Sequence, residues 1–335
     1  GVAGFAAAGG FAAAGGAGPF FFRACAARRF SADPASTTTA SAKAFTLRPT
    51  ELFIRYLSFF RRNHWCPTVY RPPPPRFSCE PMSLDAPALA FDTISHQFGE
   101  FSALADISRT IPAGQFAAFV GPSGCGKTTL LNLAAGLLTP TAGSVSCFGA
   151  PLVGLNRRAT YLFQQDALLP WKTVLENVAA GPRWSHAEPA RAKEEAKVWL
   201  ERVGLSAFAN HYPSQLSGGM KKRAALAQNW ILHRDLLLLD EPFAALDVHT
   251  RLQMHQELLR LWTLERKTAL LVTHDLEEAV SLADRVLVLS RAPGRIIADH
   301  PVPLERPRHR SDPQFQALVT RLWSDLEAQV EVHAR

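Results

Sequence analysis

The sequence predicts an α/β fold in which helices cover a mainly parallel sheet. Short apolar runs alternate with helical patterns along residues 87–300, as expected of repeated strand–helix units. A glycine-rich loop at residues 121–128 lies between one apolar run and a helical pattern. A longer, mainly helical stretch, residues 173–232, interrupts the alternation and indicates an inserted subdomain.

Composition indicates a globular chain of one large or two small domains. The 335 residues are 47% hydrophobic and 19% charged. The formal net charge of +7 arises within residues 1–81, which hold ten of the 36 Lys and Arg and three of the 29 Asp and Glu. Residues 82–335 therefore carry 26 of each and are neutral, which disfavours nucleic acid as a partner. The five cysteines form no CxxC pair, so they predict neither a disulfide framework nor a zinc site and favour a reducing compartment.

Residues 1–81 have the composition of a low-complexity, basic and disordered segment. They contain a tandem repeat, Gly4–Gly10 and Gly10–Gly16, followed by Arg-rich, Ser/Thr-rich and Pro-rich stretches without a sustained period. The first methionine is Met82, close to the first strand pattern. Two interpretations stay open: upstream sequence joined by a wrongly assigned start, and a transit peptide, which is also rich in Arg and Ser and poor in acids.

The rest of the chain is expected to form a domain over residues 82–310, with a helical insert at about 165–232, and a C-terminal helix within 311–335. That last helix is indicated by Ser311-Asp312-Pro313, a capping residue followed by proline in the first turn. Glycines interrupt the longest uncharged run, residues 1–22, so no segment is expected to span a membrane.

Each expected element has its own local signal. Alternating apolar and polar residues predict a strand at 87–98, and continuously apolar residues predict buried strands at 115–120 and 236–239. Charge pairs four residues apart support a helix at 187–203. Further strands are expected at 102–108, 144–148, 158–163, 269–273 and 285–289, and further helices at 127–138, 220–232, 248–265 and 276–283.

The loop after the third strand fits the phosphate-binding pattern G-x-x-x-x-G-K-[ST] at every position. Its glycines let backbone N–H groups converge on a phosphate, Lys127 adds a positive charge, and the Thr128 hydroxyl can bind Mg²⁺. The alternative is an ordinary glycine turn. Within the phosphate loop, Cys125 is expected to be a small filler. The residues expected to bind nucleotide here are Gly121, Pro122, Ser123, Gly124, Cys125, Gly126, Lys127 and Thr128.

Two acids follow the buried strand at 236–239. Bare carboxylates are unfavourable inside a sheet, so Asp240 and Glu241 are expected at its carboxyl end, beside the phosphate loop. There Asp240 can hold Mg²⁺ through water and Glu241 can polarise an attacking water. The alternative is a solvated strand end without a catalytic role.

A second possible anion site opens the helix at 220–232. Ser217-Gly218-Gly219 combines a hydroxyl with free backbone amides at a helix start. Such turns are common, so by itself this motif leaves an ordinary helix cap open.

In this order the motifs resemble the nucleotide-binding subunit of an ATP-binding cassette (ABC) transporter. The resemblance implies a P-loop NTPase fold with a RecA-like core, an antiparallel β subdomain and an inserted α-helical subdomain. It also implies ATP and Mg²⁺ as ligands. The implied site residues are Phe98 on adenine, Gly121–Thr129 including Thr129 as the Walker A loop, Gln164 as the catalytic and metal-binding Q-loop glutamine, Ser217, Gly218 and Gly219 as the signature, Asp240 and Glu241 as Walker B, Asp247 as the D-loop aspartate and His274 as the switch histidine.

Several of these residues have structural alternatives. His274 could cap the helix that follows it, Gln164 could be an exposed loop amide, and Phe98 could belong to the core. The signature also departs from its commonest form at Met220, Lys222 and Gln228, beyond the Ser-Gly-Gly that would meet phosphate.

The resemblance also implies partners. It predicts a head-to-tail dimer that encloses ATP, integral-membrane permease subunits, an extracytoplasmic solute-binding protein acting indirectly, and a peripheral position at the cytoplasmic face of a bacterial inner membrane. Leu168–Trp171 and Pro293–Ile296 resemble the nitrate, sulfonate and taurine importers, a branch that includes importers of a thiamine pyrimidine precursor. The segment before Trp171 is expected to dock a permease helix, with a core role for Trp171 as the alternative.

A soluble ABC ATPase acting on DNA or ribosomes is the alternative function. The single cassette, the short insert and the neutral body disfavour it. A P-loop kinase or GTPase would not explain Ser217–Gly219 together with His274.

Overall fold

The computed structural model describes residues 86–184 and 188–331. All of them belong to Leu47–Arg335, one of the two units into which the chain divides. The two interpretations of residues 1–81 therefore lie outside the described residues.

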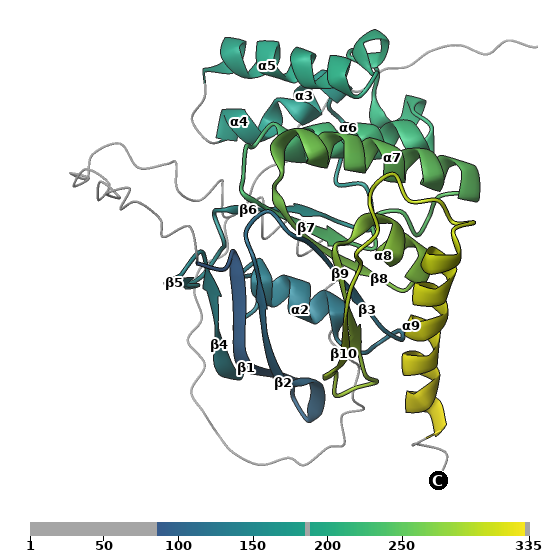
Figure 1. Cartoon of the computed structure of the whole chain (residues 1–335). Coiled ribbons are helices and arrows are strands. Elements are labelled where there is room, and N and C mark those ends of the chain that lie inside the picture. Colours follow the sequence, from purple (N-terminus) through teal and green to yellow (C-terminus); the bar gives the residue numbers. More distant parts are fainter. Residues whose placement is uncertain (1–85, 185–187, 332–335) are drawn as a thin grey trace, which may run out of the picture. The chain divides into compact units, whose positions relative to one another are not determined.

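A six-stranded sheet forms the centre of this unit (Figure 1). Its strands are β3 (Phe116–Val120), β6 (Ala159–Leu162), β7 (Leu236–Asp240), β8 (Thr268–Thr273), β9 (Arg285–Leu289) and β10 (Ile296–Pro301). The order is β10-β9-β3-β8-β7-β6, and all neighbours run parallel except β10 beside β9. β3, β7 and β8 are buried along their whole length, as expected of parallel strands covered on both faces.

A second, antiparallel sheet confirms the predicted β subdomain. It consists of β1 (Leu89–Phe98), β2 (Phe101–Ile111), β4 (Ala142–Cys147) and β5 (Ala150–Pro151) in the order β2-β1-β4-β5. Residues 99–100 connect β1 to β2, so that Phe98 pairs with Phe101 at the end of the hairpin. Side chains such as Leu89 and Ile94 face inward and are fully buried.

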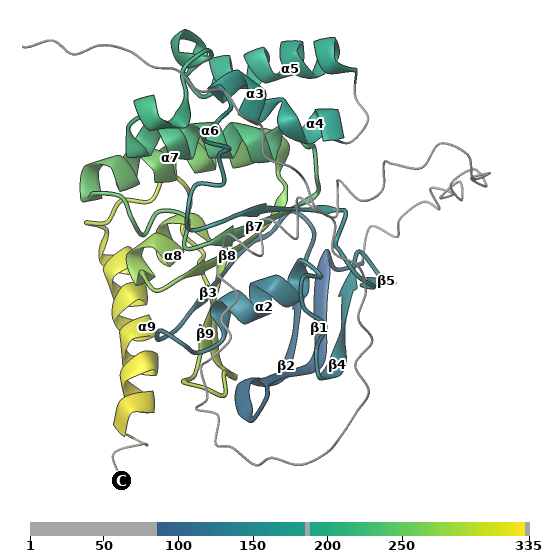
Figure 2. The ribbon, with the colours of Figure 1, turned by 180° about the vertical axis from the view of Figure 1, so that it is seen from behind.

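Helix α2 (Lys127–Ala134) lies between the two sheets (Figures 1 and 2). Its Leu130 and Leu131 are fully buried in one core with the inner side chains of β1 and β2 and one face of the parallel sheet. Because α2 begins at the loop that leaves β3, this packing fixes the loop at the carboxyl end of the central strand.

Side chains on the other face of the parallel sheet form a second core with side chains of most of the remaining helices. The remaining helices are α3 (Val174–Val178), α4 (Ala180–Trp184), α5 (Pro189–Arg202), α6 (Gly218–Trp230), α7 (Val248–Glu265), α8 (Leu276–Leu282) and α9 (Pro313–Glu331), with two short 3₁₀ turns, Ser206–Phe208 and Pro213–Gln215. The largest fully buried side chains of this second core are Trp230, Trp262, Phe116, Phe243 and Phe315. Helices α3 to α6 gather next to α7 and form the inserted helical subdomain (Figure 1).

One local expectation was wrong, and two strands were not expected. Helix α2 ends at Ala134 and not at Leu138, because Gly136 has a φ of 68° and a Cβ there would lie 1.8 Å from the Gly154 carbonyl oxygen. The two other differences are strands that the sequence did not indicate, β5 and β10. Both are largely exposed or half-buried, so neither carries the continuous apolar pattern of the central strands.

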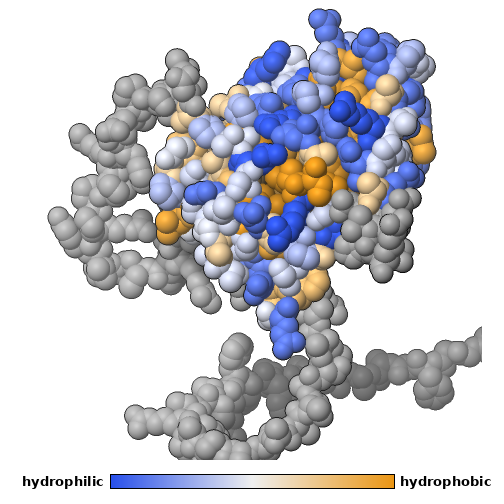
Figure 3. Space-filling view, turned by 60° about the horizontal axis from the view of Figure 1, so that its bottom comes forward, coloured by the Kyte–Doolittle hydropathy of each residue, from blue (hydrophilic) through white to orange (hydrophobic). Residues whose placement is uncertain are grey.

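Within residues 86–184 and 188–331, no helix combines the length and the apolarity needed to cross a membrane. In Figure 3 the molecule is turned so that the lower end of Figure 1 comes forward; the β1–β2 hairpin lies at that end. Hydrophobic residues, coloured orange, gather in the middle of this view. At the end of this hairpin, Phe98 and Phe101 are 45% and 55% exposed.

Candidate nucleotide-binding site

The loop between β3 and α2 is built around glycines that no other residue could replace without displacement. A Cβ on Gly121 would lie 2.9 Å from both Cys125 Sγ and the Leu289 carbonyl oxygen. Gly126 has a φ of 95°, and a Cβ there would lie 2.7 Å from the Ala103 carbonyl oxygen. The loop is thus held between β2, β9 and α2.

Lys127 places its ammonium group inside this loop. The residue is only 5% exposed, and Nζ donates hydrogen bonds to the carbonyl oxygens of Gly121 (2.8 Å) and Pro122 (2.9 Å). No side chain of the described residues caps the N-terminus of α2, so its first amides are left facing the loop that also surrounds the ammonium. This combination of a positive charge and backbone donors suits a phosphate group. Cys125 is buried beneath it, and burial raises the pKa of its thiol.

Asp240 lies at the carboxyl end of β7, where the sequence predicted it. Its Oδ1 accepts a hydrogen bond from Thr128 Oγ1 at 3.0 Å, and its Oδ2 accepts one from the Tyr161 hydroxyl at 3.0 Å. Burial of the carboxyl group raises the pKa of Asp240, and the two hydrogen bonds partly oppose that shift. The contact joins Walker B to the phosphate loop.

The Thr128–Asp240 pair fits a magnesium ion chemically. Mg²⁺ prefers oxygen ligands, and it is usually held by one or two protein groups together with substrate phosphates and water. A hydroxyl and a carboxylate 3.0 Å apart beside a phosphate loop provide such a set.

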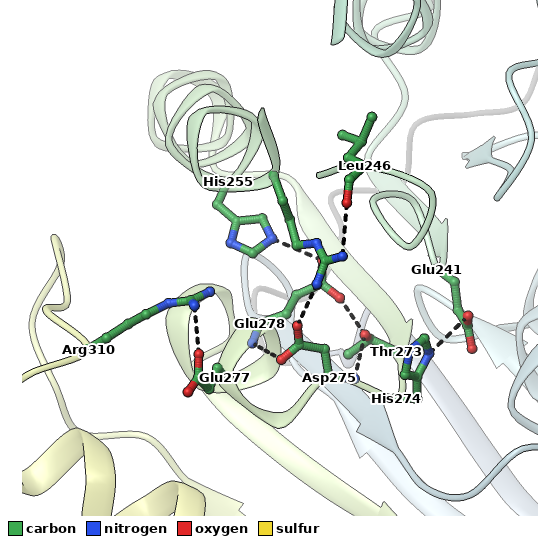
Figure 4. A network of polar contacts seen from close by, with 10 residues as sticks. Glu241, Leu246, His255, Thr273, His274, Asp275, Glu277, Glu278 and Arg310 are labelled. Atoms are coloured by element: carbon green, nitrogen blue, oxygen red, sulfur yellow. Dashed lines mark hydrogen bonds and ion pairs between the residues drawn. The ribbon is translucent and has the colours of Figure 1, made fainter. Parts of the chain in front are cut away.

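Glu241 and His274 form the second pair of the site. They follow β7 and β8, which are adjacent parallel strands, so both side chains leave the same edge of the sheet. His274 Nδ1 lies 3.1 Å from Glu241 Oε2 (Figure 4). Glu241 has a φ of 41°, an uncommon conformation for a residue with a side chain, and its N–H donates to the Val272 carbonyl oxygen at 2.9 Å. Such backbone strain is concentrated at functional sites.

Two further predicted residues lie on neighbouring segments. Gln164 comes shortly after β6, the strand beside β7; its side chain is exposed, and its carbonyl oxygen accepts a hydrogen bond from Lys222 Nζ at 2.8 Å. Phe98 is 45% exposed at the end of β1, and its ring packs edge-on against His96 with a centroid distance of 4.6 Å. Its exposure disagrees with a purely core role.

The signature residues lie at the start of α6. Ser217 Oγ accepts a hydrogen bond from the Met220 N–H, and a Cβ on Gly219 would lie 2.9 Å from Thr250 Cγ2 in the first turn of α7. Asp247 caps α7 by accepting from the Thr250 N–H at 3.0 Å, and this bond lowers the pKa of its carboxyl group. Among the described residues, no hydrogen bond or ion pair joins Ser217–Gly219 to the phosphate loop.

Three polar residues contact this site without having been assigned a role in it from the sequence. Tyr161 holds Asp240, Lys222 holds the Gln164 main chain, and Arg251 connects two loops beside the site. The site role of Tyr161 could have been inferred from strand pairing. β6 pairs with β7, and Tyr161 lies opposite Leu238, two residues before Asp240. Burial raises the pKa of Tyr161, so its hydroxyl stays protonated and donates.

Known proteins share the sequence that carries these site residues. The sequence model of the ABC transporter family matches residues 104–244. The aliphatic sulfonates import ATP-binding protein SsuB of Burkholderia thailandensis is 50% identical over 230 residues, which are 68% of this chain and 65% of that protein. The SsuB of Burkholderia pseudomallei is 49% identical over 229 residues, 68% of this chain and 67% of that protein. The chain thus spans about two thirds of these sulfonate-import relatives.

A shorter relative is covered almost completely. A putative ATP-binding protein of Brucella abortus is 42% identical over 240 residues, which are 71% of this chain and 92% of that protein. The solved structure of CbiO1 from Clostridium perfringens, part of the ABC transporter complex cbiONQ, matches with a TM-score of 0.60 over 65% of this chain and 90% of that chain, at 24% identity. This likeness shows the predicted fold, a P-loop NTPase of the ABC type. By fold and by sequence, the chain belongs to the ABC transporter family, as one of its ATP-binding ATPases.

Proposed function

We propose that this chain hydrolyses ATP to drive an importer of an aliphatic sulfonate. The sulfonate-import ATP-binding proteins, at 49–50% identity, support this choice of solute. Nitrate, taurine and a thiamine pyrimidine precursor are the other solutes that the sequence motifs favour, and the transport test below separates them.

Each side chain of the site has a role that follows from its position. Lys127 and the amides at the start of α2 hold the phosphates of ATP. Glu241 accepts a proton from the attacking water, and His274 keeps the Glu241 carboxylate oriented. Mg²⁺, when bound, neutralises developing phosphate charge, with Thr128, Asp240 and Gln164 as the residues that hold it.

A second copy completes the site in this proposal. Ser217–Gly219 offer a hydroxyl and backbone amides to an anion, and they lie beside α7. In a head-to-tail pair, these residues of one copy close over the ATP held by Lys127 of the other. Specific activity should therefore rise with protein concentration until the dimer is saturated.

The observation that carries the ATPase proposal is the Glu241–His274 pair at 3.1 Å, next to the Thr128–Asp240 pair on the same sheet edge. Glu241→Gln keeps the side-chain shape and removes the base. We expect kcat to fall about 10²–10⁴-fold while ATP still binds and holds the dimer together. Lys127→Ala should instead lose affinity for ATP, and a Glu241→Gln variant with near-normal steady-state turnover would exclude Glu241 as the base.

The helical subdomain offers a surface for the permease. Trp171 is 70% exposed and follows a segment fixed by the buried Asn177, whose side chain contacts both the N–H and the carbonyl oxygen of Leu169. Tyr212, 45% exposed, lies next to His211, whose backbone carbonyl oxygen accepts from the Val174 N–H at 2.9 Å. We infer that these apolar side chains meet an integral-membrane subunit at the cytoplasmic face, and that a solute-binding protein delivers the solute from the other side.

Transport can be tested in cells that lack the gene for this chain. We expect loss of growth on ethanesulfonate, an alkanesulfonate that lacks the amino group of taurine, as sole sulfur source, rescued by the parent chain and not by Glu241→Gln, and co-purification of a permease. Loss of growth on nitrate, on taurine or without thiamine would redirect the solute. Co-purification with nucleic acid or ribosomes and no permease would favour the soluble ATPase instead.

A further inference from the structure

Arg251, in the first turn of α7, connects two loops beside the catalytic pair. Its Nη2 donates to the Leu246 carbonyl oxygen at 3.0 Å, and its Nη1 lies 3.1 Å from Asp275 Oδ2 (Figure 4). The side chains of Arg251 and Asp275 are 26% and 25% exposed, so both contacts are partly shielded from water. The Arg251 guanidinium therefore contacts both the segment before α7, at Leu246, and the segment before α8, at Asp275.

The two ends of this connection lie at different parts of the site. Leu246 packs next to the signature, because a Cβ on Gly218 would lie 3.6 Å from Leu246 Cδ2. Asp275 directly follows His274, which contacts Glu241 at 3.1 Å. Arg251 thus joins the neighbourhood of the signature to the position of the histidine.

Asp275 is held rigidly enough to transmit such a constraint. Its Oδ1 accepts from the Glu278 N–H, and its own N–H donates to Thr273 Oγ1, each at 3.0 Å. The Thr273 hydroxyl donates to the Glu278 carboxylate, which also contacts the buried His255 at 3.1 Å. A shift of Asp275 therefore moves the backbone on both sides of His274 and not a lone side chain.

We propose that Arg251 is a positioning residue for ATP hydrolysis. Its contact with Asp275 fixes the position of His274 beside Glu241. Its contact with the Leu246 carbonyl oxygen couples the position of His274 to the segment beside the signature. The inference rests on the proposed function: in the head-to-tail dimer this segment meets the second copy, so Arg251 makes hydrolysis respond to dimer closure.

An arginine is needed because its fork reaches two acceptors at once. A lysine at this position keeps the charge but carries all its donors on one nitrogen, so it does not reproduce the fork in which Nη2 reaches Leu246 and Nη1 reaches Asp275. Arg251→Lys is therefore the informative variant. Arg260→Lys is the matched control on the same helix, since Arg260 contacts Glu257 and the Arg202 carbonyl oxygen on the surface.

The experiment measures steady-state ATPase rates over a range of ATP and protein concentrations. We expect Arg251→Lys to lower kcat about 5–50-fold, within the range of coupling between sites, and to leave KM for ATP within about twofold. In the Glu241→Gln background, Arg251→Lys should still form the ATP-dependent dimer on size-exclusion chromatography. Asp275→Asn should lower kcat similarly, and the double variant should lose little more than either one, because both break the same connection.

Two results would overturn the inference while the proposed function stands. One is an Arg251→Lys variant with the kcat of Arg260→Lys. The other is a raised KM or a lost dimer with kcat unchanged, which would make Arg251 a binding or folding residue. A parent chain without ATPase activity would instead contradict the proposed function, so the two failures are distinguishable.

Discussion

At the scale of single residues, Asp240 combines a functional position with an unfavourable environment. The carboxyl group is 9% exposed, and its pKa is raised from the ordinary value of 3.8 because burial disfavours the charged form. The hydroxyls of Thr128 and Tyr161 stabilise the charge but do not cancel the effect of burial. Such an unfavourable burial of a carboxylate is expected at a position that binds a cation.

Asp240→Asn should therefore stabilise the protein at neutral pH and abolish Mg²⁺-dependent ATP hydrolysis. A carboxyl group with a raised pKa in the folded state favours folding when protonated, and that advantage is lost as pH rises through its pKa. The stabilisation, of about 1 kcal/mol, raises Tm by a few degrees; it should be absent below pH 3.8 and appear as pH rises above that value. Thermal melts in EDTA across this range measure it.

Asp235→Asn provides the control for this prediction. Asp235 immediately precedes β7, at the end opposite to Asp240, and pairs with Arg158 at 2.7 Å in an exposed ion pair. Its substitution should leave ATPase activity unchanged and should not stabilise the protein. A lower Tm of Asp240→Asn than of the parent at neutral pH would contradict the role assigned to burial.

At the scale of elements, local sequence signals predicted a helix or strand correctly where a capping residue or a continuous apolar run marks its boundary. Helix α7 has the bounds predicted from sequence, because Asp247 caps its start and Arg266 ends it with a left-handed backbone. The central strands were found because both their faces are buried. The end of α2 was missed because Leu137 and Leu138 continue the apolar pattern beyond Gly136.

Contacts between elements could not be predicted in the same way. The sequence places Lys222 on the helix that follows the signature, but its partners lie more than 50 residues away in the chain. Nζ donates to the Gln164 carbonyl oxygen at 2.8 Å and lies 3.0 Å from Asp166 Oδ1, while the residue itself is 2% exposed. This buried contact attaches the Q-loop backbone to α6.

Lys222→Met should weaken both the fold and the reaction. It leaves the Gln164 carbonyl oxygen without its donor and the partly exposed Asp166 carboxylate without its ion-pair partner, for a loss of about 1–3 kcal/mol. It also frees the Q-loop from α6, so kcat should fall. Lys222→Gln should be milder because its amide can still donate to Gln164. Thermal melts and ATPase rates with Lys221→Gln as the neighbouring control decide it: equal behaviour of Lys222→Met and Lys221→Gln would refute the attachment.

At the scale of the whole described unit, the C-terminal segment is the part whose docking the sequence could not foresee. Pro313 marked the start of α9, but nothing local indicated where the helix packs. Its Phe315, Val319 and Leu322 are buried in the core on the face of the parallel sheet opposite α2. The segment before α9 is attached to α8 through arginine side chains, and α8 starts next to His274.

Arg308 should be the main anchor of this attachment. Its guanidinium donates to the Val280 and Ala283 carbonyl oxygens, both at 2.6 Å, in the last turn of α8, where carbonyls lack helical partners. Burial, reinforced by the nearby Arg306, lowers its pKa to about 10, so the group remains charged at neutral pH.

Arg308→Ala leaves buried carbonyl oxygens without donors, and the protein should lose about 1–3 kcal/mol, or roughly 2–4 °C in Tm for each kcal/mol. Hydrogen exchange should rise in α8 and α9 and stay unchanged in α2, because α2 belongs to the other core. Arg310→Ala is the control, since its ion pair with Glu277 is partly exposed and should contribute less than about 1 kcal/mol. An equal increase of exchange in α2 would mean that the two cores unfold together and that Arg308 does not anchor a separate C-terminal element.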